Sequence, residues 1–276
     1  MMYTIERPKN FDIAQIFDCG QCFRFNKHES KENTYCGVAF GKYLEITQSE
    51  NSVDFNCDKE TFDTLWYSFL NLDNDYSLYI DSFKDDKTLY TASQFSSGIR
   101  ILKQDPWETL CSFIISQNNN IPRIKGIIEN MSKAYGEKIE CGDGIERYAF
   151  PTANSLYEAG TDAIFALKTG FRAKYIYDAA SKVAVGEFDL NAIFDMPLDE
   201  AMQALMTIKG VGPKVASCVL LFGFSKYDAF PIDVWVKKIL NNYYSDGMSP
   251  HFTGKHAGIA QQYLFYYERC KNNVYL

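Results

Sequence analysis

The sequence lacks any long apolar run. No stretch of about 20 apolar residues, the length that crosses a bilayer, occurs in the chain. Its start, MMYTIERPKN, contains neither the apolar core of a secretory signal nor an Arg-rich amphipathic presequence. We therefore expect a globular protein with no membrane partner, located in the cytoplasm or, in a eukaryote, in the nucleus.

An excess of positive charge is also lacking. The chain has 28 Lys and Arg against 35 Asp and Glu, a net charge of −7, whereas proteins that bind nucleic acids usually carry a basic surface. The charge is unevenly placed, because the segment 168–182 contains four basic residues and one acidic residue. A local basic surface can therefore exist within an acidic protein.

The eight cysteines form no pattern of metal ligands or paired disulfides. In a chain without a signal sequence we expect them to be reduced thiols. Cys19 and Cys22 form a CxxC, but neither a second such pair nor a His pair stands at zinc-finger spacing. We therefore expect no metal held by side chains.

The chain divides by the period of its apolar residues, with no internal repeat and no low-complexity linker. Between residues 19 and 57, polar residues alternate with Phe, Tyr, Val and Ile, which predicts an antiparallel sheet. From residue 59 onward apolar residues recur at helical spacing. The expected fold class is α+β, with the sheet and some helices in 1–104 and a helical region in 105–276.

Several helices can be placed from caps and period. Asp105 is a cap, Pro106 suits the first turn and Glu108 completes a capping box, so a buried helix is expected over 105–117. A polar run of Gln and Asn ends it, and Pro122 begins the next helix. Further helices are expected at 153–167, 172–185, 198–208, 213–224, 232–243 and 255–270.

The segment LMTIKGVGPKVA at 205–216 predicts a helical hairpin, part of a unit spanning 198–224. One helix ends at Gly210, Gly212 permits a tight turn, and the following Pro suits the first turn of the next helix. The backbone N–H groups of Gly210, Val211 and Gly212 can approach a phosphate, because glycine has no β-carbon and the helix dipole favours negative charge. An ordinary helical hairpin would show the same pattern.

Lys214 directly follows the hairpin proline. In the first turn of a helix its charge opposes the dipole, which favours the neutral, nucleophilic amine. Asp233 follows 19 residues later within PIDV. Taken alone, Asp233 is more simply a helix cap, so this pair by itself leaves catalytic and structural interpretations open.

The strings GVGPKVA (210–216) and PIDV (231–234) resemble the signature of the helix-hairpin-helix (HhH-GPD) DNA glycosylase superfamily, whose bifunctional members carry the Lys. Further strings resemble its 8-oxoguanine branch: GQCFRF (20–25), SQNNNIPRI (116–124), GFRAKYI (170–176) and AGIAQQYLFYYE (257–268). They span nearly the whole chain in the family's order. The resemblance implies a TBP-like N-terminal sheet and a glycosylase with abasic-site (AP) lyase activity that excises 8-oxoguanine from DNA, preferably opposite cytosine.

Carried over residue by residue, the resemblance implies a catalytic pair. Lys214 is the nucleophile that attacks C1′ of the deoxyribose and forms a Schiff base, after which β-elimination cleaves the strand. Asp233 stabilises the positive charge that develops on the sugar. The base must first be flipped out of the duplex, because C1′ is inaccessible in a stacked helix.

The resemblance also implies a base pocket, on which the C-terminal helix packs. Cys218 and Phe265 lie on the two faces of the flipped base, and Gln261 reads its Watson–Crick edge. The Gly20 backbone carbonyl senses the lesion, and Phe23 forms a wall of the pocket. Without the family match, Cys218 and Phe265 would be interpreted as ordinary core residues.

For the cytosine left behind in the duplex, the resemblance assigns Asn118, Arg123 and Arg172, with Phe171 as the aromatic wedge. Two positions depart from the family. Trp235 replaces a His of the animal enzymes and Glu268 replaces an Asp, so the hydrogen bonds behind the base pocket are not carried over.

Two alternatives remain at this stage. A relative that excises oxidised pyrimidines or mispaired adenine would carry a four-Cys iron–sulfur loop, whereas only Cys270 follows Cys218 here. A non-catalytic helix-hairpin-helix module would need neither Lys214 nor Asp233. The favoured interpretation is a monomer, associated with the nucleoid in a prokaryote, that binds double-stranded DNA containing 8-oxoguanine. It requires no cofactor and has no Fe–S cluster, and the hairpin carbonyls can hold K⁺ or Na⁺ as in relatives.

Overall fold

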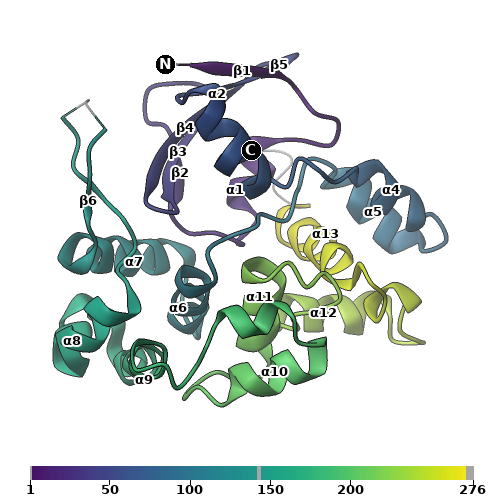
Figure 1. Cartoon of the computed structure of the whole chain (residues 1–276). Helices are drawn as coiled ribbons and strands as arrows, with labels where there is room; N and C mark the ends of the chain where they lie inside the picture. Colours follow the sequence, from purple (N-terminus) through teal and green to yellow (C-terminus); the bar gives the residue numbers. More distant parts are fainter. Residues whose placement is uncertain (1, 142–143, 272–276) are drawn as a thin grey trace.

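A computed structural model describes residues 2–141 and 144–271. Five antiparallel strands form a sheet at one end of the molecule (Figure 1). They are β1 (Tyr3–Glu6), β2 (Phe25–Lys27), β3 (Thr34–Ala39), β4 (Lys42–Gln48) and β5 (Ser52–Phe55), in the order β1-β5-β4-β3-β2. The expected α+β class, with an N-terminal antiparallel sheet and a helical remainder, is confirmed.

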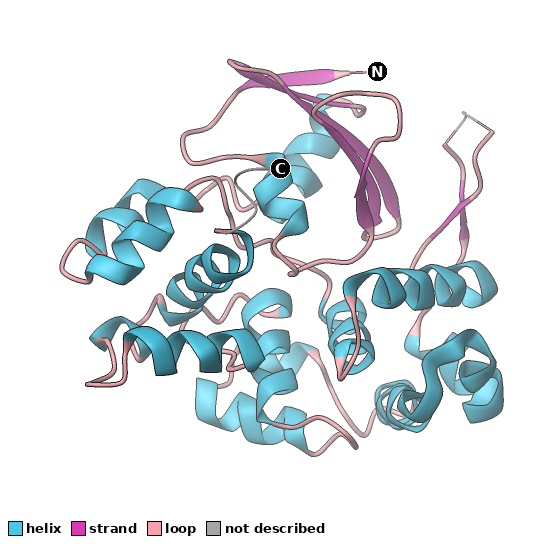
Figure 2. Cartoon of the chain, turned by 180° about the vertical axis from the view of Figure 1, so that it is seen from behind, coloured by secondary structure: helices cyan, strands magenta, loops and turns pink. Residues whose placement is uncertain are grey.

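Helices cover one face of the sheet. Alternation along the strands buries one face, as shown by Leu44 and Ile46 in β4 and by Val53 and Phe55 in β5. Their partners come from α1 (Ile13–Asp18) and, after the exposed turn α2 (Lys59–Thr61), from η1 (Phe62–Trp66) and α3 (Tyr67–Phe69). Figure 2 shows the sheet standing beside the larger helical part.

The helical part has a second hydrophobic core. Its longer helices are α4 (Tyr76–Ser82), α5 (Lys87–Phe95), α6 (Pro106–Ser116), α7 (Ile121–Tyr135), α8 (Ala153–Ile164), α9 (Ala173–Ala184), α10 (Leu198–Met206), α11 (Pro213–Gly223), α12 (Val234–Tyr243) and α13 (Ala257–Cys270). Short turns η2 (Phe165–Thr169), η3 (Gly170–Arg172), η4 (Asn191–Phe194) and η5 (Pro250–Phe252) connect them. Although they precede residue 104, α4 and α5 belong to this core, and α5 packs on α13.

The expected helices from 105 onward are confirmed within a few residues of their ends. The structure adds β1, which pairs with β5 across some fifty residues of chain, the short helices α1, α4 and α5, and a small hairpin of β6 (Lys138–Ile139) and β7 (Arg147–Tyr148). Residues 19–22 form a turn instead of a strand. Elements of this length show too few periods for a sequence pattern to reveal them.

No helix within the described ranges is long and apolar enough to cross a membrane.

Candidate active site

The hairpin between α10 and α11 positions the first candidate residue. Gly210 has φ +80°, and a β-carbon there would lie 2.4 Å from the ring of Tyr175, so both backbone and space require glycine. The Val211 N–H donates to Ile208 O at 3.0 Å and closes the turn. Helix α11 then begins at Pro213, which puts Lys214 in its first turn as the sequence predicts.

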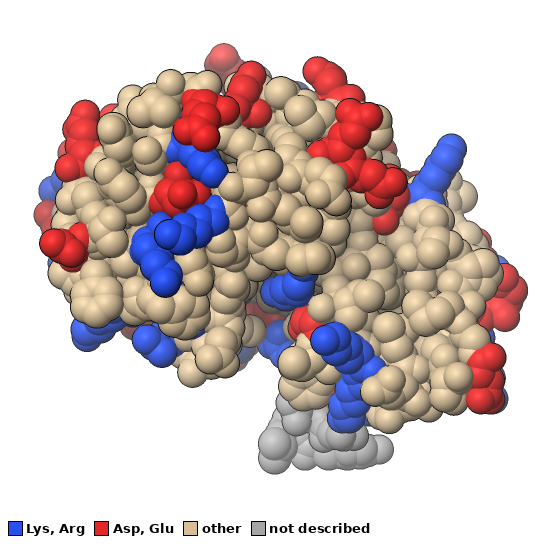
Figure 3. Space-filling model, turned by 90° about the horizontal axis from the view of Figure 1, so that it is seen from below, with Lys and Arg blue, Asp and Glu red and all other residues tan. Residues whose placement is uncertain are grey.

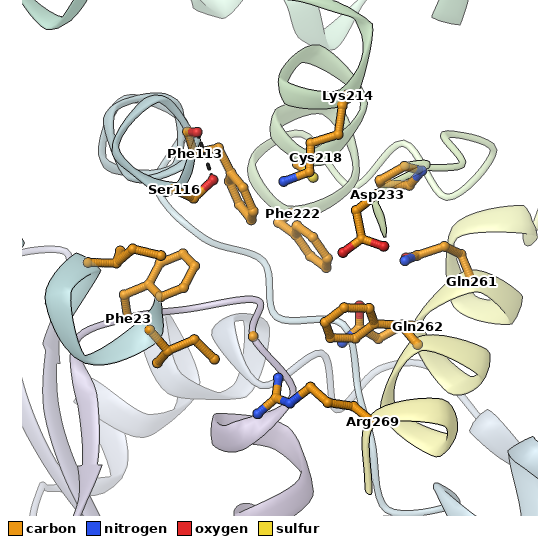
Figure 4. Close-up of a pocket in the computed structure, with 15 residues that line it drawn as sticks. Phe23, Phe113, Ser116, Lys214, Cys218, Phe222, Asp233, Gln261, Gln262 and Arg269 are labelled. Atoms are coloured by element: carbon orange, nitrogen blue, oxygen red, sulfur yellow. Dashed lines mark hydrogen bonds between the residues drawn. The ribbon is translucent and has the colours of Figure 1, made fainter. Parts of the chain in front are cut away.

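Asp233 caps a different helix. Its Oδ1 accepts hydrogen bonds from the N–H groups of Trp235 and Val236, at 2.9 and 2.8 Å, at the start of α12. Both bonds use the same oxygen, and the carboxylate faces a cavity into which the Lys214 amine also points (Figure 4). The cap interpretation is therefore correct, and it holds the carboxylate in place beside Lys214.

This cavity, of about 120 Å³, brings together seven predicted residues from four segments of the chain. They are Gly20, Phe23, Lys214, Cys218, Asp233, Gln261 and Phe265. The rest of the lining was not predicted and consists of Phe113, Ser116, Ile121, Ile124, Phe222, Pro231, Gln262 and Arg269. Helical spacing could have found Arg269, which lies one turn beyond Phe265; the others carry no sequence signal distinct from that of core residues.

The inner wall of the cavity is aromatic. The Phe113 ring stacks on Phe222 with centroids 5.4 Å apart and meets the edge of Phe23 at 5.8 Å. The Lys214 Nζ lies 5.4 Å from the centre of the Phe113 ring. Burial raises the pKa of the Cys218 thiol to about 11, although Lys214 opposes the shift. Cys218 is therefore a neutral thiol near pH 7 and serves as wall, not as nucleophile.

Two residues that line the cavity each carry an unused hydrogen-bond acceptor. The Gln261 Oε1 is buried and has no partner among the described residues. Near Gly20, which has φ +80°, side chains occupy the carbonyls of neighbouring residues: Arg269 donates to Asp18 O, Gln262 to Cys19 O and Gln104 to Gln21 O. Within the described chain no hydrogen bond reaches the Gly20 carbonyl. A ligand could use both acceptors, since buried polar groups are usually satisfied.

A wider groove of about 650 Å³ adjoins the cavity and shares Lys214, Asp233, Phe265 and Arg269 with it. Asn118, exposed at the end of α6 with φ +47°, lies in this groove.

The other predicted opposite-base residues do not line the groove. Arg123 and Phe171 are exposed. Arg172 is 2% exposed, and its guanidinium donates to the carbonyls of Gln117, Asn118 and Thr169. In this structure Arg172 therefore holds the Asn118 loop, and contact with a cytosine requires some of these bonds to be exchanged.

The two positions that depart from the family form a network of their own. The Glu268 carboxylate is buried and binds Lys238 Nζ at 2.9 Å, Lys271 Nζ at 2.5 Å and the Tyr243 hydroxyl at 3.2 Å. Burial raises the pKa of Glu268, but hydrogen bonds from the two lysines outweigh it and leave the pKa below its usual value. Trp235 lies in the groove, and the Lys238 Nζ is 5.5 Å from the centre of its ring. Glu268 of α13 is thus joined to α12 through the Lys238 ammonium and the Tyr243 hydroxyl.

Comparison with known protein families identifies the family of the chain. A model described as "8-oxoguanine DNA glycosylase, N-terminal domain" matches residues 4–110, and one described as "HhH-GPD superfamily base excision DNA repair protein" matches residues 111–251. The chain belongs to the 8-oxoguanine glycosylase branch of this superfamily. The boundary between the two models lies six residues beyond the division expected at residue 104.

Relatives of this glycosylase family cover most of the chain. The N-glycosylase/DNA lyase of Saccharomyces cerevisiae is 39% identical over 255 residues, covering 84% of this chain and 68% of the relative. The corresponding OGG1 of Arabidopsis thaliana is 30% identical over 242 residues, with coverages of 84% and 66%.

Solved structures of the family are similar over nearly their full length. The Clostridium acetobutylicum 8-oxoguanine glycosylase/lyase, in complex with double-stranded DNA containing cytosine opposite 8-oxoguanine, has a TM-score of 0.90 at 39% identity and covers 99% of both chains. MBOgg1, in complex with a low-affinity DNA ligand, has a TM-score of 0.93 at 40% identity, covering 98% of this chain and 96% of that one.

Proposed function

We propose that this protein is a bifunctional DNA glycosylase and AP lyase that flips 8-oxoguanine out of duplex DNA, excises it and cleaves the strand. The observation that carries the proposal is the convergence of Lys214 and Asp233 on a cavity whose other walls include all the residues expected to hold the base. The full-length similarity to glycosylase/lyase structures supports it.

The chemistry follows from the two side chains. The Lys214 amine attacks C1′ as the C1′–N9 bond breaks, and the bonding pair leaves with the base. The Asp233 carboxylate lies where it can offset the positive charge that develops on the sugar. Loss of a proton and opening of the sugar ring give the Schiff base, and β-elimination then breaks the C3′–O bond.

The cavity suits a flipped purine. Cys218 and Phe265 supply apolar surfaces for its faces, and the unpartnered Gln261 Oε1 can accept from N–H groups of its Watson–Crick edge. The free Gly20 carbonyl can accept from N7–H, which 8-oxoguanine has and guanine lacks. Together these groups favour the oxidised base.

The hairpin suits a DNA phosphate. Since the Val211 N–H already donates to Ile208 O, the proposal rests on the N–H groups of Gly210 and Gly212, which have no partner in the described chain.

Figure 3 shows Lys and Arg side chains gathered around a hollow of one face, with acidic side chains mostly toward its margin. A polyanion can therefore approach despite the net charge of −7.

No cofactor enters these steps. No group of three or more His, Cys, Asp or Glu side chains in 2–141 and 144–271 could hold a metal ion. The hairpin offers backbone carbonyls, neutral oxygen donors that suit K⁺ or Na⁺, although Thr207 O already accepts from Lys182 Nζ at 2.7 Å. When bound, such a cation would add positive charge near the phosphate. Because it acts on DNA, we expect this protein in the cytoplasm, associated with the nucleoid, of a prokaryote or in the nucleus of a eukaryote.

The test is covalent trapping. With borohydride and a duplex containing 8-oxoguanine opposite cytosine, the wild-type protein should form a stable adduct, whereas Lys214→Gln should form none and excise no base while still binding the duplex. A Lys133→Gln variant, which removes an exposed amine at the end of α7 outside the cavity, should trap normally. Adduct at wild-type level in Lys214→Gln would assign the nucleophile elsewhere, and no adduct with wild type would favour a non-catalytic DNA-binding module.

A further inference from the structure

One charged residue of the cavity has no role in the chemistry described above. Gln261, Phe265 and Arg269 follow one another at intervals of four along α13, so they share one face of that helix. All three line the cavity. The first two have assigned roles in holding the base, whereas Arg269 extends the same face by one turn toward the segment that contains Gly20.

The Arg269 guanidinium is fixed at one nitrogen and free at another. Its Nη2 donates to Asp18 O at 3.1 Å, and its Cζ lies 5.7 Å from the centre of the Phe265 ring. Its Nη1 is buried and has no hydrogen-bond partner among the residues described. A β-carbon built on Gly20 would lie 3.4 Å from this nitrogen, so Nη1 lies beside the Gly20 backbone.

This arrangement puts an unused donor beside the residue that carries an unused acceptor. A buried donor without a partner is unfavourable, and charged donors make the stronger hydrogen bonds. A ligand edge that carries an N–H next to a carbonyl oxygen would satisfy both groups. Its N–H would donate to the Gly20 carbonyl, and its oxygen would accept from the Arg269 Nη1–H. In 8-oxoguanine, N7–H is flanked by O8 and O6, and guanine offers neither N7–H nor O8.

We propose that Arg269 is a further base-contacting residue, whose Nη1–H donates to the carbonyl oxygen next to N7 while the Gly20 carbonyl accepts from N7–H. The inference rests on the proposed excision of 8-oxoguanine. As the C1′–N9 bond breaks, its electron pair moves into the base, and the negative charge spreads onto the carbonyl oxygens. The guanidinium stabilises that charge, and the departing base then takes up the proton lost by the Lys214 nitrogen.

The experiment compares excision with strand cleavage in Arg269→Leu and Arg269→Lys. Single-turnover excision of 8-oxoguanine opposite cytosine should fall by roughly 10- to 100-fold in Arg269→Leu and by less in Arg269→Lys, which keeps the charge. Cleavage at a preformed abasic site, which has no base to contact, should fall far less. Arg7→Leu is the matched control, because Arg7 also donates to a backbone carbonyl, Phe11 O, but lies outside the cavity.

Each outcome decides the proposal. Excision by Arg269→Leu at the wild-type rate, or an equal fall in excision and abasic-site cleavage, overturns it, the latter because Arg269 would then act only by holding the Asp18 carbonyl. Failure of the wild-type protein to excise 8-oxoguanine would instead remove the proposed function and this inference with it.

Binding in the Lys214→Gln background identifies the oxygen. 8-oxoadenine keeps O8 and N7–H but carries an amino group in place of O6. If adding Arg269→Leu weakens binding of both bases, the contact is to O8, and if it weakens binding of 8-oxoguanine alone, the contact is to O6. No loss for either base contradicts the contact.

Discussion

At the scale of single residues, the central question is how Gly20 could separate 8-oxoguanine from guanine. The two bases differ at O8 and at N7, which carries a proton in the lesion and a lone pair in guanine. The Gly20 carbonyl would gain a hydrogen bond from the lesion and would meet a lone pair in guanine. Because the adjacent carbonyls are occupied by side chains of Arg269 and Gln262, this acceptor is held in position before the base arrives.

This comparison predicts the affinities of three duplexes for the Lys214→Gln protein. Loss of one hydrogen bond should weaken binding of guanine relative to 8-oxoguanine by roughly 1–3 kcal/mol, about 5- to 150-fold, at this contact. 8-bromoguanine, which has bulk at C8 but no proton at N7, should bind like guanine. Titration of the three duplexes checks this. If 8-bromoguanine bound as tightly as 8-oxoguanine, the pocket would read the 8-substituent, and Gly20 would have no such role.

Asp233 combines a structural and a proposed catalytic role, and one substitution separates them. In Asp233→Asn the amide oxygen can still cap α12, since Asn and Asp are similarly good caps, so the melting temperature should change little. Excision should slow by about 100-fold or more, because a neutral amide cannot offset the charge on the sugar. Asp233→Ala should lose the cap as well, at a cost of about 1 kcal/mol. An Asp233→Asn protein with wild-type excision would leave the carboxylate with only its capping role.

At the scale of elements, the loop between α6 and α7 is joined to η3 by a buried arginine. Arg172 donates to the backbone carbonyls of Gln117 and Asn118, while Arg123 is exposed in the first turn of α7. Burial and the nearby Arg123 charge lower the pKa of Arg172. Of the two arginines, Arg123 is the one whose side chain is exposed to solvent.

This difference predicts which arginine sets the preference for cytosine. Arginine donors suit the O2 and N3 acceptors of cytosine, whereas adenine presents an amino donor. The wild-type protein should excise lesions faster opposite C than opposite A, and Arg123→Ala should reduce that ratio by about 5-fold or more. Lys133→Ala, an exposed cation in the last turn of the same helix, should leave the ratio unchanged. Equal wild-type rates opposite C and A would contradict the assignment of both arginines.

The start of α6 and the residues of the candidate site show what the sequence could predict. Asp105 and Pro106 mark the start of α6, and the chain indeed begins a helix there, because caps are local interactions. The proposed catalytic pair was identified because the hairpin and PIDV strings resemble a family signature. Phe113 was not found as a site residue, since its place in the cavity depends on how α6 approaches other segments. Arg172 was identified, but nothing in the sequence indicates that its guanidinium donates to carbonyls of the loop between α6 and α7.

At the scale of the whole molecule, a partly buried charge cluster lies between the two hydrophobic cores. Arg24, just before β2, reaches Glu108 in α6 at 3.9 Å and Glu129 in α7 at 3.8 Å, and donates to Tyr148 O at 2.6 Å. Burial raises the pKa of Glu108 to about 7, and the nearby charge of Asp105 adds to this effect while Arg24 opposes it. A carboxyl group at the junction of the cores therefore titrates near neutral pH.

The sign of the pH effect follows from linkage. Since the folded protein keeps the Glu108 proton to about pH 7 and the unfolded chain loses it near pH 4.5, this group's contribution to stability is greatest below pH 4.5. It falls as the pH rises to about 7 and is constant above that. A shift of this size corresponds to about 3 kcal/mol at most.

The Glu108→Gln side chain cannot titrate, so the melting temperature of this variant minus that of wild type should rise by several degrees from pH 5 to pH 8. Glu129→Gln is the matched control, because Glu129 also lies beside Arg24 but is 60% exposed. If the difference in melting temperature between Glu108→Gln and wild type stayed constant from pH 5 to pH 8, Glu108 would be ionised in the folded protein throughout. The charge of Arg24 would then offset the burial of the carboxylate in full.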